Sequence, residues 1–299
     1  MSDLTPRDLG IRLGVHLSIS GGIDKTPRRA RDLGINAFQI FSQNVRSWKT
    51  REIGDDEARR FRESRSEFEL EFAVIHTSYL LNLASPDQEL WKKSQAGLAR
   101  ELKRAHKLGI DHVNAHIGAH TGSGLQKGLS RLIEALNSVA KTEAFRNSEV
   151  RILLENTAGA GTALGGSFCQ FNEIFSSLSQ PDRFGICLDT CHAYAGGYDI
   201  SSPSGLTNTL DQLDREVGLD RLELIHLNDS KGELDSHLDK HQHIGEGEIG
   251  EQGFKNVVTH PKLKSRPMVL ETPKEELRGM DGDKANLCKI IELVRAGSG

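Results

Sequence analysis

Short apolar segments alternate with longer, more polar segments along most of the chain. A parallel strand that is buried on both faces reads as a nearly continuous apolar run. Eight segments have this character: Ile11–His16, Ala37–Ser42, Phe72–His76, His112–His116, Val150–Glu155, Phe184–Asp189, Leu222–Asn228 and Pro267–Glu271. Eight such strands separated by helical segments predict an α/β fold, a single (β/α)8 TIM barrel.

Helix signals occupy most of the intervals between these strands. We expect helices from Thr26 to Gly34, over Asp55–Phe68, from Ser85 to near Gly109, over Leu125–Phe145, after Ser167, over Leu210–Val217 and over Ala285–Arg295. The polar stretch Asp229–Gly250 is expected to form a long loop. Because no linker or break in composition interrupts the pattern, we expect one domain over residues 1–299, with residues 1–10 as a flexible tail.

Side chains that can bind metal ions follow the last six expected strands. Six lie at strand ends and three lie just beyond: His76, His116, Glu155, Asp189, His226 and Glu271, then His192, Asp239 and His241. The active site of a (β/α)8 barrel lies at the C-terminal ends of its strands, so all nine would share one pocket. The spacing Asp189-x-x-His192 allows these two residues to face different ions, whereas Asp239-x-His241 suits a single ion.

The composition of this set indicates the kind of metal site. Imidazole and carboxylate without thiolate suit zinc, manganese or iron. A single catalytic zinc ion usually has three protein ligands, so nine candidates are too many for one ion. They predict a multinuclear cluster in which a carboxylate bridges two ions.

The charge of the chain changes the picture once this pocket is considered. The formal net charge of −4 taken alone argues against a nucleic-acid-binding protein. Glu155, Asp189, Asp239 and Glu271 together carry the same charge. One divalent ion would leave the pocket at about −2, which repels a phosphodiester, whereas three would make it about +2, which attracts one.

Other features are less specific. The glycine-rich stretch Ala158–Gly166 lacks the G-K-[ST] ending of a phosphate-binding loop and is expected to be a tight turn. The loop QNVRSWK is either an ordinary solvated loop or a nucleic-acid finger, in which Arg46 offers charge and Trp48 a stacking face. We expect His16, His120 and His243 to lie beside the pocket as supporting groups.

The chain of 299 residues, 36% hydrophobic and 27% charged, has the composition of a globular protein. No apolar run is long enough to cross a bilayer, and the first ten residues lack the apolar core of a signal peptide. We therefore expect a cytoplasmic protein without a membrane partner, whose four cysteines are reduced and packed.

With these residues in view, the sequence resembles the endonuclease IV family of apurinic/apyrimidinic endonucleases. The resemblance extends from Gly14 to Pro273 through GVHLSISGG, FSQNVRSW, HTSYLLNLASP, HIGAHTG, LLENTAGAG, GICLDTCHAYAGGYD, IHLNDSK, DKHQHIGEG and LETP. It implies three zinc ions per chain, with Mn²⁺ as an alternative at one position. The implied ligand sets are His76, His116 and Glu155; Glu155, Asp189, His226 and Glu271; and His192, Asp239 and His241.

The resemblance also implies an activity. Family members cleave the phosphodiester 5′ to an abasic site in double-stranded DNA, leaving a 3′-hydroxyl and a 5′-deoxyribose phosphate, through a hydroxide that bridges metal ions. It implies removal of 3′ phosphate and phosphodiester blocks, catalytic roles for Glu155 and Glu271, and a monomeric enzyme. Arg46 and Tyr79 match positions that contact DNA, although Ser47 replaces a longer amide found in some relatives.

Two other classes remain open on the residues alone. A sugar isomerase or epimerase on the same barrel would use one or two ions and need about four ligands, with no role for Asp239 or His241. A non-catalytic barrel would bind damaged DNA or metal without cleavage. The number of bound ions and the presence of cleavage separate the three.

Overall fold

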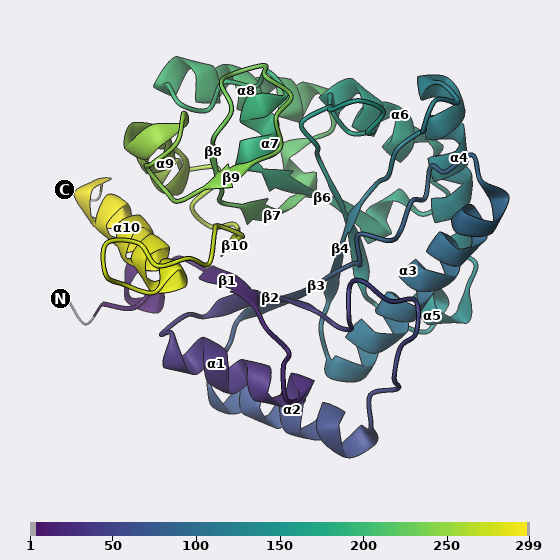
Figure 1. Ribbon diagram of the computed structural model, residues 1–299, viewed down its shortest axis with the longest axis horizontal. Coiled ribbons are helices and arrows are strands. Elements are labelled where there is room, and N and C mark those ends of the chain that lie inside the picture. Colours follow the sequence, from purple (N-terminus) through teal and green to yellow (C-terminus); the bar gives the residue numbers. More distant parts are fainter. Residues whose placement is uncertain (1–3, 298–299) are drawn as a thin grey trace.

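Eight parallel strands close into a barrel in the computed structural model, which describes residues 4–297 (Figure 1). The barrel strands are β1 (Leu13–Leu17), β2 (Ala37–Phe41), β3 (Phe72–His76), β4 (His112–His116), β5 (Arg151–Glu155), β6 (Phe184–Asp189), β7 (Leu222–His226) and β10 (Met268–Leu270). Around the barrel they follow the order β1-β10-β7-β6-β5-β4-β3-β2. The predicted TIM barrel is confirmed.

Helices surround the strands on the outside of the barrel (Figure 1). They are α1 (Thr26–Asp32), α2 (Asp55–Glu67), α3 (Gln88–Leu108), α4 (Leu125–Val139), α5 (Glu143–Arg146), α6 (Phe168–Ser177), α7 (Thr190–Ala195), α8 (Pro203–Glu216), α9 (Gly250–Thr259) and α10 (Gly282–Gly297). Short 3-10 helices lie at Arg7–Leu9, Ile23–Lys25, Pro181–Arg183 and Leu219–Arg221. In α3, the Asp87 carboxylate accepts from the backbone N–H of Leu90, and Gly109 ends the helix at a φ of 66°.

The two-residue period of the strands places apolar side chains directly beneath the candidate ligands. A buried cluster inside the barrel consists of Ala37, Phe72, Val74, Leu153, Cys187, Leu224 and Val269. Five of these lie two residues before a candidate ligand: Val74, Leu153, Cys187, Leu224 and Val269. Because alternate residues of a strand point to the same side, the ligands at the strand ends also point into the barrel.

Several predicted boundaries were wrong, for local reasons. The expected helix Leu125–Phe145 is interrupted after Val139, and the hydroxyl of Thr142 caps a separate helix, α5. Helix α8 begins at Pro203, seven residues before the expected Leu210, because Ser202 caps it and proline is favoured in the first turn.

Two helices and a hairpin were not predicted. Helix α7 follows β6 directly, and α9 begins at Gly250, at the end of the expected loop. Within that loop, β8 (Asp229–Ser230) pairs antiparallel with β9 (His241–Gln242). The carboxylate of Asp229 is buried and accepts from the backbone N–H groups of Gly245, Gly247 and Ile249, which explains how a polar loop keeps a defined shape.

The expected tail divides into two parts. Residues 1–3 lie outside the described residues. Arg7–Leu9 form a 3-10 helix, and the Arg7 guanidinium pairs with Glu69 and Glu71. A flexible tail over the whole of residues 1–10 does not fit these contacts.

Candidate metal centre

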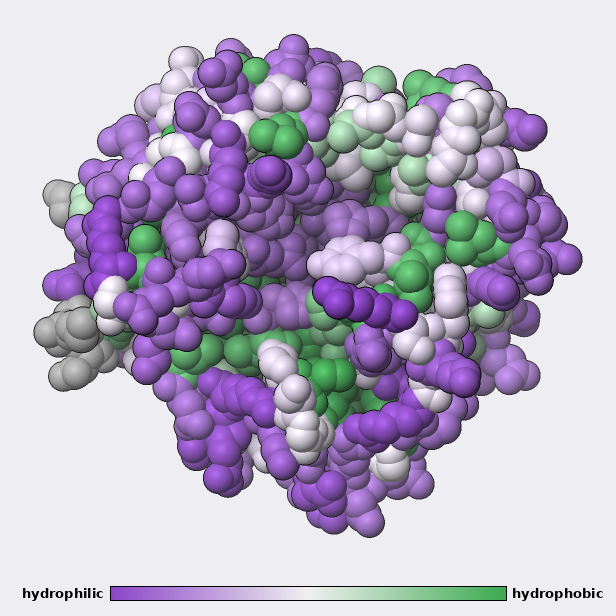
Figure 2. Space-filling view, viewed as in Figure 1, coloured by the Kyte–Doolittle hydropathy of each residue, from purple (hydrophilic) through white to green (hydrophobic). Residues whose placement is uncertain are grey.

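The nine side chains predicted as metal ligands lie together at the C-terminal ends of the barrel strands. Six come from strands β3 to β7 or from the residue after β10, His192 comes from α7, and Asp239 and His241 come from the loop and hairpin after β7. They form three groups, two of which share Glu155, and the nitrogen and oxygen atoms of each group are close enough to bind one ion. The face of the molecule that Figures 1 and 2 present is hollowed near its centre, with hydrophilic side chains over much of its border (Figure 2).

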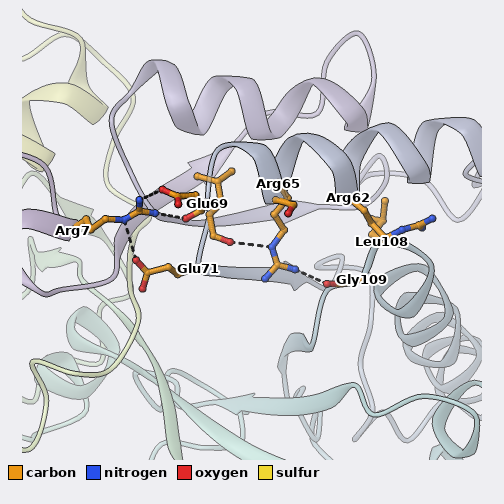
Figure 3. A pocket seen from close by; sticks show the side chains of 9 residues that line it. Arg7, Arg62, Arg65, Glu69, Glu71, Leu108 and Gly109 are labelled. Atoms are coloured by element: carbon orange, nitrogen blue, oxygen red, sulfur yellow. Dashed lines mark hydrogen bonds and ion pairs between the residues drawn. The ribbon is translucent and has the colours of Figure 1, made fainter.

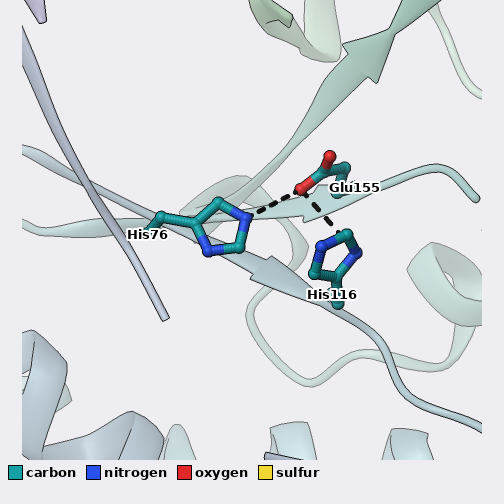
Figure 4. A group of neighbouring side chains, drawn as sticks. All are labelled: His76, His116 and Glu155. Atoms are coloured by element: carbon teal, nitrogen blue, oxygen red, sulfur yellow. Dashed lines mark hydrogen bonds and ion pairs between the residues drawn. The ribbon is translucent and has the colours of Figure 1, made fainter. Parts of the chain in front are cut away.

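The first group consists of His76, His116 and Glu155. Both imidazole rings approach one oxygen of Glu155 (Figure 4). His76 Nε2 lies 3.2 Å from Glu155 Oε2, and His116 Nδ1 lies 3.9 Å from the same oxygen. His76 Nδ1 lies 2.7 Å from the carbonyl oxygen of Thr77, so Nε2 is the nitrogen that faces the group.

The second group uses the other oxygen of the same glutamate. His226 Nδ1 lies 3.1 Å from Glu155 Oε1, 3.3 Å from Glu271 Oε2 and 3.7 Å from Asp189 Oδ2. All four side chains together could hold one ion. Glu155 therefore faces two groups with its two oxygens, which is the arrangement that a bridging carboxylate requires.

The third group lies nearer to solvent. His192 Nε2 is 3.2 Å and His241 Nε2 is 3.6 Å from Asp239 Oδ1, and the side chain of Asp239 is 54% exposed. Among the described residues, His241 Nε2 is buried without a hydrogen-bond partner. A buried nitrogen that has no partner and faces carboxylates fits a cation ligand.

The negative carboxylates in the pocket are balanced by protonated histidines. Burial alone would raise the pKa of the Glu155 carboxyl, but His116 and His226 hold it well below its ordinary value. Burial would lower the pKa of His192, but Asp189 and Asp239 raise it to about 10. Bound cations can replace such protons, because a metal ion needs the same carboxylates ionised and the imidazoles neutral.

Amide side chains that were not predicted support the ligands. Asn114 Nδ2 donates to Glu155 Oε2 at 2.8 Å, and Asn228 Nδ2 donates to Asp189 Oδ2 at 2.6 Å. The Asn156 amide bonds the backbone of Asp189 in both directions, and Gln39 contacts two further ligands. The available signal was an amide inside an otherwise apolar strand, as in AFQIF and HVNAH.

Only one of the three expected supporting histidines contacts a candidate ligand. His16 Nδ1 lies 3.4 Å from Glu271 Oε1. His120 Nδ1 accepts from the N–H of Gly124, and His243 Nδ1 lies 3.0 Å from the Asn286 amide. These last two histidines therefore hold loops in place.

The two residues matched to DNA contacts lie at the mouth of the barrel. The ring of Tyr79 is 5.9 Å from that of His76 and 6.1 Å from that of His116, yet this residue is 63% exposed. Partial burial, together with the nearby carboxylates of Glu271 and Glu155, raises the pKa of Tyr79 to about 12. Arg46 is exposed and, among residues 4–297, its guanidinium forms no ion pair. Trp48 is 36% exposed in the same loop.

A pocket of 310 Å³ adjoins the first and third groups. Tyr79, His116, His192 and Asp239 line it, together with small apolar residues of the glycine-rich loop. Positive φ angles at Gly159, Gly161 and Gly165 of that loop confirm the tight turn expected for Ala158–Gly166.

A second pocket, of 520 Å³, lies at the opposite end of the barrel (Figure 3). Arginines line it, and each of Arg7, Arg62 and Arg65 donates to an oxygen of the protein itself. Arg7 pairs with Glu69 and Glu71, Arg62 donates to the carbonyl of Lys107, and Arg65 donates to the carbonyls of Leu70 and Gly109. This pocket shares no residue with the nine candidate ligands.

No helix within residues 4–297 combines the length and the apolar character needed to cross a membrane.

Known proteins that resemble this chain agree with both the fold and the site. Residues 27–293 match the family described as "Xylose isomerase-like TIM barrel". The probable endonuclease 4 of Halothermothrix orenii is 45% identical over 279 residues, which are 93% of this chain and 99% of that protein. The probable endonuclease 4 of Methanoculleus marisnigri is 41% identical over 286 residues, 96% of this chain and 100% of that protein.

Solved structures with this barrel differ widely in their sequence identity to this chain. The crystal structure of endonuclease IV from Thermus thermophilus matches with a TM-score of 0.82 and 38% identity over 95% of this chain and 99% of that one. A D-tagatose 3-epimerase-like protein matches with a TM-score of 0.71 but only 18% identity, over 96% of this chain and 98% of that one, so it shares the barrel alone. The chain belongs to the endonuclease IV family and is a hydrolytic endonuclease.

Proposed function

We propose that this protein repairs DNA by hydrolysing the phosphodiester 5′ to an abasic site, leaving a 3′-hydroxyl and a 5′-deoxyribose phosphate. It also removes phosphate and phosphodiester blocks from 3′ ends and acts as a monomer. The observation that carries the proposal is the position of Glu155, whose two oxygens face two separate ligand groups beside a third. An epimerase site, which needs about four ligands, would leave the third group without a purpose.

Three zinc ions fit the side chains that are present, one in each group, with manganese as an alternative in one position. His76, His116 and Glu155 would hold the first ion, and His192, Asp239 and His241 the third. The second would be held by Glu155, Asp189, His226 and Glu271. When bound, the ions supply a water that ionises near neutral pH and positive charge for the phosphate oxygens.

The protein's own residues keep this arrangement fixed. Asn114 donates to Glu155 Oε2 and so holds the carboxylate that the first two groups share. The backbone N–H of Glu271 donates to Asn228 Oδ1. This hydrogen bond holds the backbone of Glu271 in place, so that its carboxylate lies beside His226. Glu155 and Glu271 are therefore the carboxylates that we assign to catalysis, one linking two groups and the other orienting the attacking water.

Selectivity for an abasic site follows from the pocket beside the ligands. A nucleotide without a base has lost its stacking, so turning it out of the helix costs less than turning out an intact one. The pocket of 310 Å³ between the first and third groups is a place for the extruded sugar. Arg46 and Tyr79, exposed at the mouth, are positioned to contact the phosphates and the gap in the stack.

The test is incubation of the purified, zinc-loaded protein with a duplex that carries one abasic analogue, beside a sample treated with EDTA. The number and identity of bound ions are measured on the same preparation. We expect a nick 5′ to the lesion, lost in EDTA, and about three ions per chain. Absence of a nick together with one or two ions would overturn the proposal and favour an epimerase, to be screened with sugars. A bound but uncut duplex would indicate the non-catalytic barrel.

A further inference from the structure

The geometry points to Gln39 as a positioning residue that determines which nitrogen of His226 faces the second ligand group and holds Glu271 beside it. This inference rests on the proposed role of that group as a metal site. Gln39 lies in the middle of β2, a strand that contributes none of the nine candidate ligands. Its side chain is completely buried inside the barrel.

Gln39 reaches across the mouth of the barrel. Around the barrel, β1 and β10 separate β2 from β7, which carries His226. The amide nevertheless contacts His226 and Glu271, two ligands of the same group. Gln39 Oε1 lies 2.9 Å from His226 Nε2, and Gln39 Nε2 donates to Glu271 Oε1. The second N–H of the amide points to His16 Nδ1, at 3.0 Å.

The orientation of the amide follows from the chemistry of its neighbours. An ionised carboxylate has no hydrogen to donate, so only the amino group of Gln39 can face Glu271 Oε1. The amide oxygen must then face His226 Nε2, and this nitrogen must carry a hydrogen. His16 Nδ1 accepts the remaining amide hydrogen, so both hydrogens and the oxygen of the amide are used.

The consequence for His226 is a fixed tautomer. Because Nε2 keeps its hydrogen, Nδ1 presents its lone pair to the group that contains Glu155, Asp189 and Glu271. The hydrogen bond on one imidazole nitrogen sets which nitrogen can bind a metal, and it also fixes the plane of the ring. Gln39 thus aligns two ligands of one ion with a single planar group.

An apolar residue of similar size would break this arrangement without opening a large cavity. In Gln39→Leu, His226 Nε2 and Glu271 Oε1 both lose their partner in a buried site. Gln39→Glu keeps an oxygen for His226 Nε2, but its ionised carboxylate has no hydrogen to donate to Glu271 and places a like charge beside it. Comparing the two variants therefore distinguishes the effect of Gln39 on the His226 tautomer from its hydrogen bond to Glu271.

The experiment measures metal affinity and the state of the His226 ring, without DNA. Bound zinc is counted while free zinc is lowered with a chelator. Long-range ¹H–¹⁵N spectra of zinc-loaded, histidine-labelled protein report each ring nitrogen, and His226→Asn identifies the signal of His226. We expect Gln39→Leu to weaken one of the three ions by about 10- to 100-fold and to alter the His226 nitrogen signals. Gln39→Glu should retain the wild-type His226 signals and still bind that ion more weakly than wild type.

Thr26→Val provides the matched control. Thr26 is completely buried in α1, its hydroxyl has no partner among the described residues, and it lies outside the nine candidate ligands. It should leave both readouts unchanged. Wild-type zinc affinity and unchanged His226 signals in Gln39→Leu would overturn the inference, as would a lower unfolding temperature with no change in the signals. If the wild type fails to cut abasic DNA while Gln39→Leu still weakens one ion, the proposed function fails and this inference stands.

Discussion

The two ends of the barrel each carry a pocket and several charged side chains, but they use charge differently. At the N-terminal end, the arginine side chains of the larger pocket bind carbonyls and carboxylates of the protein itself. At the C-terminal end, the nine candidate ligands include four carboxylates and no lysine or arginine, and His241 Nε2 has no hydrogen-bond partner among the described residues. Size and charge therefore do not identify the functional end. A gathering of imidazole and carboxylate atoms that face one another does.

Replacing a carboxylate at the C-terminal end should have the largest effect on activity, and a carboxylate at the N-terminal end serves as its comparison. Glu271→Gln at the C-terminal end should reduce cleavage of abasic DNA by about 10³-fold or more, beyond the loss typical of residues that only orient a ligand. The folded structure and binding of the abasic duplex should remain, because shape and hydrogen bonding are largely kept. Initial rates of nicking and a binding titration check both parts. A variant that still turns over at a similar rate would remove Glu271 from the mechanism.

Removal of metal should destabilise only the C-terminal end. Without cations, the buried carboxylates of Glu155 and Asp189 and the half-buried Glu271 beside them are compensated by protons on the neighbouring histidines. We expect chelation to lower the free energy of unfolding by about 4 kcal/mol for each ion present at a thousand times its Kd. Thermal unfolding with and without chelator measures this, and added zinc should restore the loss. Identical curves, with metal removal confirmed by analysis, would contradict the assignment.

Glu223 at the N-terminal end provides the counterpart of Glu271. It lies near the start of β7 and pairs with Arg151 and His112. Glu223→Gln should leave cleavage unchanged but lower the free energy of unfolding by about 2–3 kcal/mol. That is below the range for a fully buried pair, because Arg151 is 33% exposed. Urea unfolding and nicking assays on one preparation test both halves, and a large loss of cleavage would erase the distinction between the ends.

The stability that Glu223 contributes should depend on pH in one direction. Burial would raise the pKa of Glu223, but hydrogen bonds from His112 and Arg151 hold it below its ordinary value. A carboxyl whose pKa is lower in the folded state stabilises the protein above its unfolded pKa of about 4.3. That stability is lost as the pH falls through the folded pKa, so the wild type and Glu223→Gln should differ most near neutral pH and converge in acid.

The smallest effect concerns two exposed arginines. Arg46→Ala at the mouth should weaken binding of abasic DNA by about 1 kcal/mol and lower the salt dependence of binding by about one charge. Arg62→Ala at the opposite end, where the guanidinium donates to a carbonyl, should change neither quantity. Binding titrations at several salt concentrations measure both. Equal slopes for the wild type and Arg46→Ala would exclude the finger at this loop.

What the sequence predicts well here is what a strand encodes locally. The bounds of β3, β4 and β6 were predicted to the residue, because an apolar run ends on a ligand and polar residues follow. The position of these ligands at or just beyond the strand ends predicted that they share one pocket. Helices α7 and α9 were not predicted. Helix α7 has only six residues, too few to show a helical period, and two glycines interrupt the period of α9.

The supporting amides could not be predicted in this way. The hydrogen bond between Gln39 and His226 joins residues 187 positions apart, and no local pattern records which strands face one another across a barrel. An isolated polar residue in an apolar strand signals only that a partner exists. Its identity requires the closed barrel.

The cap of α7 has a consequence for how the cluster assembles. Asp189 Oδ1 accepts from the backbone N–H of His192 at 2.9 Å, while Oδ2 faces the second group. One turn of helix therefore joins Asp189, which we propose as a ligand of the second ion, to His192, which we propose as a ligand of the third. A substitution at Asp189 that removes this cap should therefore weaken both proposed sites at once.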